Sequence, residues 1–219
     1  MTTRTAIIAG ASGLVGRALL DVLLRDETWD RVVSVGRREL DRVDPKLEQR
    51  VVDFANIGEL PPCTDVFGCL GTTIKAAGSQ AAFRAVDHDA VVALAEAAYR
   101  AGAARFLHVT ALGASPGSRI FYNRVKGDTE RDVAASGVPA TVAFRPSMLD
   151  GDRAEIRPAE RLGLAAMRTV APLLGRYRPT RVTDLALAMA AAAKAGRPGH
   201  RVVDAREIGS FDLGGSSER

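Results

Sequence analysis

The sequence predicts an α/β fold in which a doubly wound parallel sheet carries helices on both faces. Short apolar runs alternate with longer amphipathic runs along the chain, as in strands that are joined by crossover helices. The first apolar run also breaks into a glycine-rich turn that leads at once into a helix. The chain has 219 residues, 47% of them hydrophobic, so it can bury a core without disulfides. We therefore expect a single domain over residues 1–213.

The expected strands are short apolar runs that end near polar or glycine residues. After the first strand, which ends at Ala9, they are Arg31–Val35, Arg50–Asp53, Asp65–Leu70, Arg105–Val109 and Ala140–Phe144. The expected helices are Gly13–Arg25, Ser79–Ala101 and Ile120–Ser136. Ser79 can cap the second of these helices, and Gly102 and Gly137 can end the second and third. Right-handed crossovers make such strands parallel, so their carboxyl ends share one edge of the sheet.

The final third of the chain, from Leu149, contains no glycine-rich linker that would separate a second domain. Helical runs at Pro158–Leu174 and Arg181–Ala195 predict a small C-terminal lobe on the substrate side, with its elements mainly in residues 147–200. The polar residues 214–219 predict a disordered tail.

Charge and composition exclude several classes of function. The net charge is +4 and the pI is about 9.4, yet the arginines are scattered and only 5% of the residues are aromatic. This pattern is typical of a solvated surface, so we expect no nucleic-acid partner. The histidines, His88, His108 and His200, have no metal-ligand spacing, so we expect no metal.

The cysteines and the apolar runs bear on the compartment. Cys63 and Cys69 have neither a metal-binding nor a redox spacing and suit a reducing compartment. The longest run of small apolar residues, Leu185–Ala193, is too short to span a bilayer, and no signal peptide precedes the first strand. We therefore expect a cytoplasmic protein without a membrane partner.

The turn Gly10-Ala-Ser-Gly13-Leu-Val-Gly16 is the most informative stretch of the chain. Gly10 permits the tight turn, Gly13 lets the backbone approach a pyrophosphate, and Gly16 lets helix and strand pack closely. The helix that follows presents free N–H groups and a partial positive charge to phosphates. Glycines also mark ordinary turns, but a position between a strand and a helix predicts a dinucleotide site. Its expected contacts are Gly10, Ser12, Gly13, Leu14, Val15 and Gly16.

An arginine pair after the second strand bears on which dinucleotide binds. NAD-preferring folds usually place a carboxylate about 20 residues past the glycines, where it bonds the ribose 2′-hydroxyl. Here that region is Gly36-Arg37-Arg38, and a guanidinium forks onto a 2′-phosphate instead. We therefore expect NADP(H) in preference to NAD(H), with Arg37 the main contact and Arg38 in support. The alternative is a solvated arginine pair in a loop.

Two further strand ends are expected at the same edge of the sheet. Asp53 and the backbone N–H of Phe54 follow the third strand, where they could meet the adenine. Cys69, Leu70, Gly71 and Thr72 close the fourth strand, where the glycine permits close approach to the cofactor. Each stretch taken alone is also compatible with a capped turn.

Tyr122 and Lys126 are the catalytic candidates. A spacing of four residues on a predicted helix puts both side chains on one face, about one turn apart. Free tyrosine has a pKa of about 10, and a neighbouring ammonium favours the phenolate and lowers that pKa. Lys126 could also hydrogen-bond the nicotinamide ribose. The alternative is an aromatic packing residue beside a solvated lysine.

These motifs, together with Val51-Val-Asp-Phe54 and Phe144-Arg-Pro146, resemble the short-chain dehydrogenase/reductases. More narrowly, they resemble the atypical or extended-like subgroup that contains the HIV-Tat-interactive-protein oxidoreductases. The resemblance covers nearly the whole chain to about Ala193. It implies a Rossmann fold with NADP(H), Tyr122 as acid/base and Lys126 as its partner. It also implies that Arg145, Pro146 and Ser147 line the nicotinamide end of the site.

The chain departs from the family at the third catalytic residue, a serine or threonine at the end of the fifth strand. Here this position falls on Thr110, which has a hydroxyl, or on Ala111, which does not. The alignment favours Ala111, and Thr110 would then have to substitute for the missing hydroxyl. Loss of one such hydrogen-bond donor lowers rates by ~10²–10³.

The leading hypothesis is an NADP(H)-dependent oxidoreductase that transfers hydride to or from a small carbonyl or hydroxyl substrate. Tyr122 would exchange the proton, Lys126 would tune it and Thr110 would polarise the carbonyl. The alternative is a non-catalytic NADP(H)-binding redox sensor or regulatory interaction protein. A homodimer stays open, because the Ser79–Ala101 helix is compatible both with a dimer interface and with simple burial.

Overall fold

The computed structural model describes residues 4–150 and 179–210, and it has a seven-stranded parallel sheet at its centre. The strand order is β3-β2-β1-β4-β5-β6-β9, with every neighbouring pair parallel. The strands are β1 (Thr5–Ala9), β2 (Arg31–Gly36), β3 (Leu47–Val51), β4 (Asp65–Gly68), β5 (Arg105–Val109), β6 (Ala140–Arg145) and β9 (Gly199–Asp204). The predicted doubly wound α/β fold is therefore confirmed.

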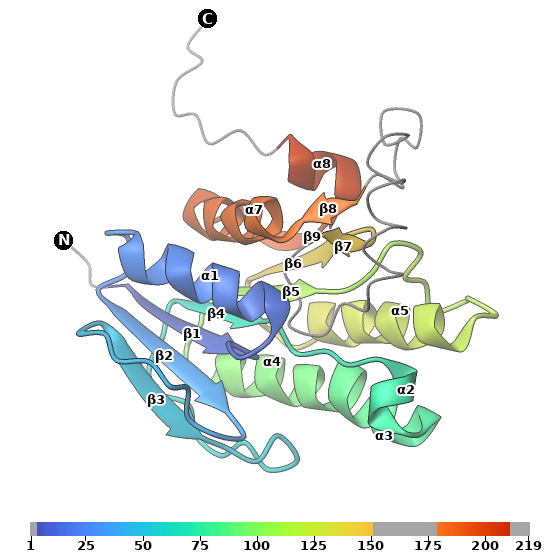
Figure 1. Cartoon of the computed structure of the whole chain (residues 1–219), viewed down its shortest axis with the longest axis horizontal. Helices are drawn as coiled ribbons and strands as arrows, with labels where there is room; N and C mark the ends of the chain where they lie inside the picture. The colour runs from blue at the N-terminus through green and yellow to red at the C-terminus, as the bar shows by residue number, and fades with distance from the viewer. Residues whose placement is uncertain (1–3, 151–178, 211–219) are drawn as a thin grey trace, which may run out of the picture.

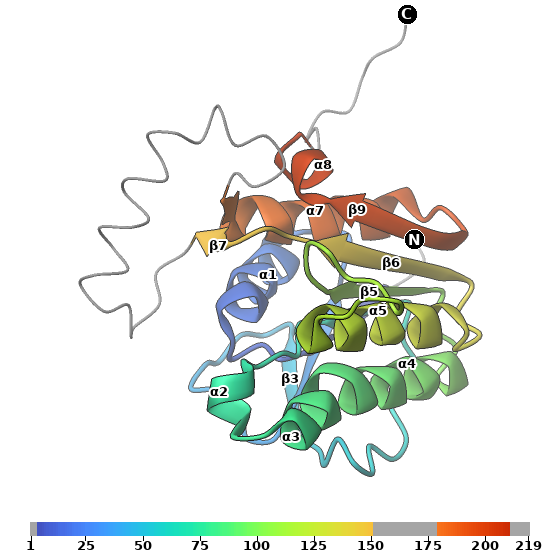
Figure 2. The same ribbon diagram turned by 90° about the vertical axis from the view of Figure 1, so that its right-hand side faces the viewer.

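Helices cover both faces of the sheet, as Figures 1 and 2 show. Helices α1 (Leu14–Arg25) and α7 (Val182–Ala195) pack side by side on one face, and α4 (Ala90–Arg100) and α5 (Phe121–Ala134) lie on the other. The short elements are α2 (Ile74–Ala77), α3 (Gln80–Arg84), α8 (Ala205–Gly209), and the parallel pair β7 (Leu149–Asp150) and β8 (Thr180–Arg181). No helix in the described ranges is both long and apolar enough to cross a membrane.

The predicted helix Ser79–Ala101 is present, but it contains a π-helical turn. The Ser79 hydroxyl caps its start by accepting the Ala82 N–H at 3.0 Å, and Gly102, with a φ of 77°, ends it. Between α3 and α4 the backbone widens into the π-helix η1 (Ala85–Asp89). Such single π-turns often occur at functional sites. This one carries Asp87 and His88, both of them buried.

The boundaries of two strands differ from the prediction. The third strand is Leu47–Val51 and not Arg50–Asp53. Its pairing with β2 begins at Leu47, opposite Val32. It is an edge strand with polar residues, so the apolar pattern marks only its end. The fourth strand ends at Gly68, two residues before the predicted end at Leu70.

The C-terminal third completes the sheet. Helix α7 confirms the predicted helical run Arg181–Ala195, but it packs against α1 on the main sheet. Strand β9, which the sequence analysis missed, pairs with β6 as the seventh strand. The expected substrate-side lobe is thus not formed by α7 or β9. The predicted helix Pro158–Leu174 and the tail 214–219 lie outside the described residues.

Candidate active site

The glycine turn between β1 and α1 has the geometry of a phosphate-binding loop. Gly10 has a φ of 83°, and its carbonyl accepts the Gly13 N–H at 2.9 Å. A Cβ at Gly16 would overlap the Gly10 carbonyl oxygen, whereas a Cβ at Gly13 would contact only that oxygen, at 3.2 Å. No side chain caps the start of α1 at Gly13. The first N–H groups of α1 are therefore left for a ligand, as a pyrophosphate site requires.

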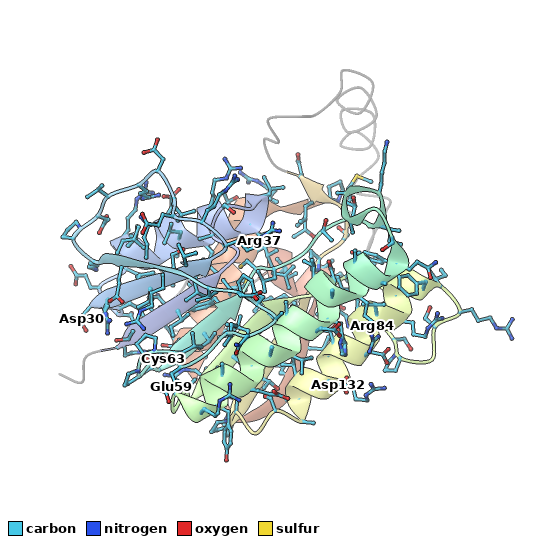
Figure 3. All side chains as sticks on the ribbon, turned by 90° about the horizontal axis from the view of Figure 1, so that it is seen from below. Asp30, Arg37, Glu59, Cys63, Arg84 and Asp132 are labelled. Atoms are coloured by element: carbon cyan, nitrogen blue, oxygen red, sulfur yellow. The ribbon has the colours of Figure 1, made fainter. Side chains whose placement is uncertain are left out.

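A pocket of about 300 Å³ lies between this turn and the end of β2. Exposed Arg37 and Arg38 line it, and Figure 3 labels Arg37. The other lining residues are Gly10, Ala11, Ser12, Ser34, Val35, Gly36 and Leu40. The structure thus brings the glycine turn and the arginine pair to one cavity.

Other arginines on β2, on β3 and in the loop between them already have carboxylate partners. Arg31 and Arg50 both pair with Glu48, and Arg42 pairs with Asp21. Within residues 4–150 and 179–210, neither Arg37 nor Arg38 pairs with a carboxylate. Their guanidinium groups are therefore available to an anion.

Asp53 and Phe54 follow β3 but do not line this pocket. Asp53 is exposed, and its carboxylate accepts the Ala55 N–H at 3.0 Å, which makes it a turn residue in this structure. Its predicted contact with adenine stays a prediction.

The stretch after β4 packs closely on the glycine turn. The Cys69 N–H donates to the Ala9 carbonyl at 2.9 Å, and a Cβ at Gly10 would overlap the Cys69 carbonyl oxygen. Burial raises the pKa of the Cys69 thiol to about 12, so this cysteine stays a neutral thiol at physiological pH. Leu70, Gly71 and Thr72 continue from it toward α5.

Tyr122 and Lys126 lie on α5, one turn apart, as predicted. The half-buried Tyr122 ring packs against Phe83, with ring centroids 5.4 Å apart. Lys126 is only 5% exposed, and its ammonium would lie 4.0 Å from a Cβ at Gly71. The alternative of a solvated lysine is therefore wrong, and Lys126 faces the stretch that follows β4.

Asp87 is a site residue that the sequence analysis missed. Its carboxylate Oδ1 lies 2.8 Å from Lys126 Nζ, and Oδ2 accepts the Thr72 N–H at 2.8 Å. A signal was available, because Asp87 interrupts the apolar stripe Phe83, Val91, Leu94 and Ala98 on the expected helix. A carboxylate on a buried helical face needs a partner of opposite charge.

Thr110 is engaged in a different network. Its hydroxyl donates to Oε1 of Glu130 at 2.6 Å and lies 3.1 Å from the Phe144 carbonyl. Both Thr110 and Glu130 are buried. The predicted role of Thr110 in polarising a substrate carbonyl is not supported by this geometry, because its one hydroxyl proton already has a buried acceptor. Ala111, the next residue, supplies no hydroxyl.

Arg145, Pro146 and Ser147 leave the carboxyl end of β6. The Arg145 guanidinium pairs with Glu130, which also raises the pKa of Arg145. The Pro146 carbonyl accepts the Leu112 N–H at 3.0 Å, and the Ser147 N–H donates to the Thr180 hydroxyl at 3.1 Å. These contacts hold the segment close to the end of β5, and its contact with nicotinamide stays a prediction.

The histidines do not form a metal site. His88 lies between Asp89 and Asp132, with ring nitrogens 2.6 and 2.8 Å from their carboxylates. His108 is fully buried on β5, and burial lowers its pKa to about 3, so it is neutral. No cluster of His, Cys, Asp or Glu in the described part of the chain could hold a metal ion.

Comparisons with known proteins give relatives for most of the chain. No family model matches it. It is 37% identical over 167 residues to the protein HTATIP2 of Rattus norvegicus, across 73% of this chain and 69% of the rat protein. It is 33% identical over 179 residues to the mitochondrial protein fmp52 of Aspergillus fumigatus, across 77% of this chain and 75% of the fungal one. The expectation of a cytoplasmic location is contradicted, because these fungal relatives are named as mitochondrial proteins.

Solved structures share the fold at low sequence identity. MoeE5 in complex with UDP-glucose and NAD has a TM-score of 0.68 and 19% identity, covering 94% of this chain and 80% of that chain. A UDP-galactose 4-epimerase has a TM-score of 0.67 and 18% identity, covering 91% and 78%. These similarities show a Rossmann-type fold, and the sequence relatives show the family. The chain belongs to the family of the HTATIP2 and FMP52 proteins.

Proposed function

We propose that this protein is an NADP(H)-dependent oxidoreductase that acts on a small carbonyl or hydroxyl substrate. The observation that carries the proposal is the buried Lys126, one helical turn from Tyr122 and facing the stretch after β4. The glycine turn lies at the same carboxyl edge of the sheet. A nicotinamide dinucleotide bound there would supply or accept the hydride.

The residues around the glycine turn fit the phosphates of such a cofactor. Gly13 has no side chain to obstruct the uncapped start of α1, where N–H groups and the helix dipole favour an anion. Gly10 and Gly16 pack too closely for a side chain. The adjoining pocket would take the adenosine ribose.

The preference for NADP(H) rests on Arg37 and Arg38. Both line the pocket beside the glycine turn, and neither has a carboxylate partner among the residues that the structure describes. A guanidinium can fork onto a 2′-phosphate, and hydrogen bonds to charged groups contribute about 1.5–3 kcal/mol each. That corresponds to roughly tenfold to hundredfold in affinity.

Tyr122 would exchange a proton with the substrate oxygen. The buried ammonium of Lys126 holds a positive charge one turn away, which stabilises the phenolate that remains after proton donation. The segment Arg145–Ser147, held by Glu130 and Thr180, would border the substrate. Thr110 is left out of the reaction because its hydroxyl donates to Glu130.

A specific observation favours a second candidate, an NADP(H)-bound redox sensor without turnover. The residues at the end of β5 provide no hydroxyl donor for a substrate carbonyl, since Thr110 is engaged and Ala111 has none. A sensor would need cofactor binding but no proton donor.

The test measures NADPH consumption across a panel of small aldehydes, ketones, quinones and enones. Tyr122→Phe removes the proposed proton donor, and Tyr99→Phe, on the exposed side of α4, is the matched control. Turnover lost only in Tyr122→Phe, with NADPH binding retained, supports the reductase. Tight NADPH binding without turnover that depends on Tyr122 supports the sensor. Failure to bind either dinucleotide overturns both.

A further inference from the structure

Two segments that border the proposed proton donor contain no carboxylate. Residues 69–86 follow β4 and carry α2 and α3, and residues 110–127 follow β5 and lead into α5. Neither range contains an aspartate or a glutamate. The rings of Phe83 and Tyr122 lie 5.4 Å apart, so α3 packs against the start of α5, and both views show α2 and α3 next to α5 (Figures 1 and 2). The two segments around Tyr122 therefore carry positive charges only.

Most of the cations in these segments have no carboxylate partner. Arg84, labelled in Figure 3, pairs with Asp128, and Lys126 pairs with Asp87. Within residues 4–150 and 179–210, the other cations of the two segments pair with no carboxylate, and they are Lys75, Arg119 and Arg124. The surface around Tyr122 therefore has an excess of positive charge.

These unpaired cations lie close to the proposed proton donor along the chain. Arg119 and Arg124 are three and two residues from Tyr122. Lys75 is four residues beyond Gly71, so at most about 14 Å separates their α-carbons, and Gly71 itself adjoins the buried ammonium on α5. Charges at such separations act over a Debye length of about 10 Å at 0.1 M salt, so they attract an anion toward Tyr122.

Exposed apolar side chains stand next to two of these cations. Ile74, which precedes Lys75 on α2, is 37% exposed, and Ile120, which follows Arg119, is 63% exposed. Lys75 and Arg119 are themselves exposed. Apolar and cationic side chains therefore share this surface, which can cover the apolar part of a ligand while attracting its charge.

We infer that the substrate is an anionic carbonyl compound with an apolar body, attracted by Lys75, Arg119 and Arg124. The inference rests on the proposed function and names the class of substrate for the same site. The anionic group is unchanged in the proposed reaction and serves only to hold the carbonyl near Tyr122. An uncharged carbonyl compound lacks this attraction, so the preference depends on ionic strength.

The test compares para-carboxybenzaldehyde with para-carbamoylbenzaldehyde, which differ in charge and little in shape. At low ionic strength we expect kcat/KM for the carboxylate to exceed that for the amide about tenfold or more, because electrostatic attraction raises encounter rates by this order. The two values should converge at about 1 M salt, where the Debye length is about 3 Å. Calorimetric titration of the NADPH-bound protein with para-(hydroxymethyl)benzoate measures binding of the anion without turnover.

Two double variants locate the attraction. Lys75→Gln/Arg119→Gln removes two exposed charges beside the proposed site, and it should lower kcat/KM for the carboxylate about tenfold while the amide stays within about twofold. Arg25→Gln/Arg100→Gln is the matched control, because both arginines are exposed at the ends of α1 and α4, which lead into β2 and β5 at the opposite edge of the sheet. The control should leave the kcat/KM of both aldehydes unchanged.

The inference is overturned if the two aldehydes have equal kcat/KM at low salt, or if the control variant lowers the preference as far as Lys75→Gln/Arg119→Gln. It is also overturned if Lys75→Gln/Arg119→Gln abolishes binding to phosphatidylglycerol vesicles but leaves the preference unchanged, because the cations would then serve a membrane surface. A protein that reduces no carbonyl of the panel would refute the proposed reaction. Calorimetry would still decide in that case whether the site binds the anion through these cations.

Discussion

The Thr110 hydroxyl donates to Glu130 at 2.6 Å, and Arg145 pairs with the same buried carboxylate. This network joins the end of β5 to α5 and β6. The network engages the Thr110 hydroxyl, and the next residue, Ala111, has no hydroxyl. In the proposed reaction, proton exchange then depends on Tyr122 and Lys126 without a hydroxyl donor from position 110 or 111.

Ala111→Ser is expected to raise turnover. The added hydroxyl would stand where the short-chain dehydrogenase/reductases that the sequence resembles have their third catalytic residue, and removal of one such donor lowers rates by ~10²–10³. We expect kcat for carbonyl reduction to rise at least about tenfold, with NADPH affinity unchanged. Steady-state kinetics on the best substrate of the panel measure kcat. An unchanged kcat in folded protein would argue that the hydroxyl is not needed here.

Thr110→Val is expected to lower stability and spare catalysis. The variant deletes a buried hydrogen bond to a carboxylate, which contributes about 1.5–3 kcal/mol to the free energy of unfolding. Urea unfolding measures this loss, and kcat should stay within about threefold. A hundredfold fall in kcat in folded protein would show instead that Thr110 takes part in catalysis.

Arg37→Ala is expected to weaken NADPH binding roughly tenfold to hundredfold and to leave NADH binding unchanged. The reason is that the guanidinium is proposed to bond the 2′-phosphate, which NADH lacks. Fluorescence titration with both dinucleotides measures the difference. Arg42→Ala, in which the lost arginine pairs with Asp21, is the matched control. Equal NADPH affinity in Arg37→Ala would refute the assignment.

Gly16→Ala and Gly13→Ala are expected to fail in different ways. A Cβ at Gly16 would overlap the Gly10 carbonyl, so this variant should lose about 1–3 kcal/mol or more of stability. A Cβ at Gly13 would lie 3.2 Å from the Gly10 carbonyl oxygen, a contact that a shift of a few tenths of an ångström relieves, and it would occupy the proposed phosphate site, so this variant should fold and lose NADPH affinity. Thermal unfolding and NADPH titration of both variants separate the two effects. Wild-type binding by Gly13→Ala would contradict the phosphate assignment.

His108 is expected to make the fold sensitive to acid. Burial lowers its pKa from 6.5 to about 3, so between these values the unfolded chain binds a proton that the folded protein does not. Stability therefore falls as pH falls through this window, by up to about 1.4 kcal/mol per pH unit. His108→Leu should flatten the pH dependence of urea unfolding between pH 6 and 4, on the order of this amount. His200→Leu, at an exposed position, should leave most of the slope, because burial is the largest cause of the lowered pKa of His108 and the charge of His200 is a smaller one.

Much of the fold could be predicted because its signals are local. The apolar run before Gly10 and the helical run after Gly16 mark β1, the turn and α1 without reference to the rest of the chain. Strand β9 was missed because it is an edge strand with His200 and Arg201, so its apolar pattern is weak. The position of α7 beside α1 depends on packing across the sheet, which no local pattern encodes.

For the site, the sequence by itself determined the residue types and their spacing: the three glycines of the turn, the arginine pair after β2, and Tyr122 with Lys126 on one helical face. Only the tertiary structure decided their partners. It paired Lys126 with Asp87, directed the Thr110 hydroxyl to Glu130, and left Arg37 beside a pocket. Spacing along one helix is set by backbone geometry, but a counter-ion comes from whichever distant element packs against it. In a buried interior, where an unpaired charge is costly, that partner determines what the group can do.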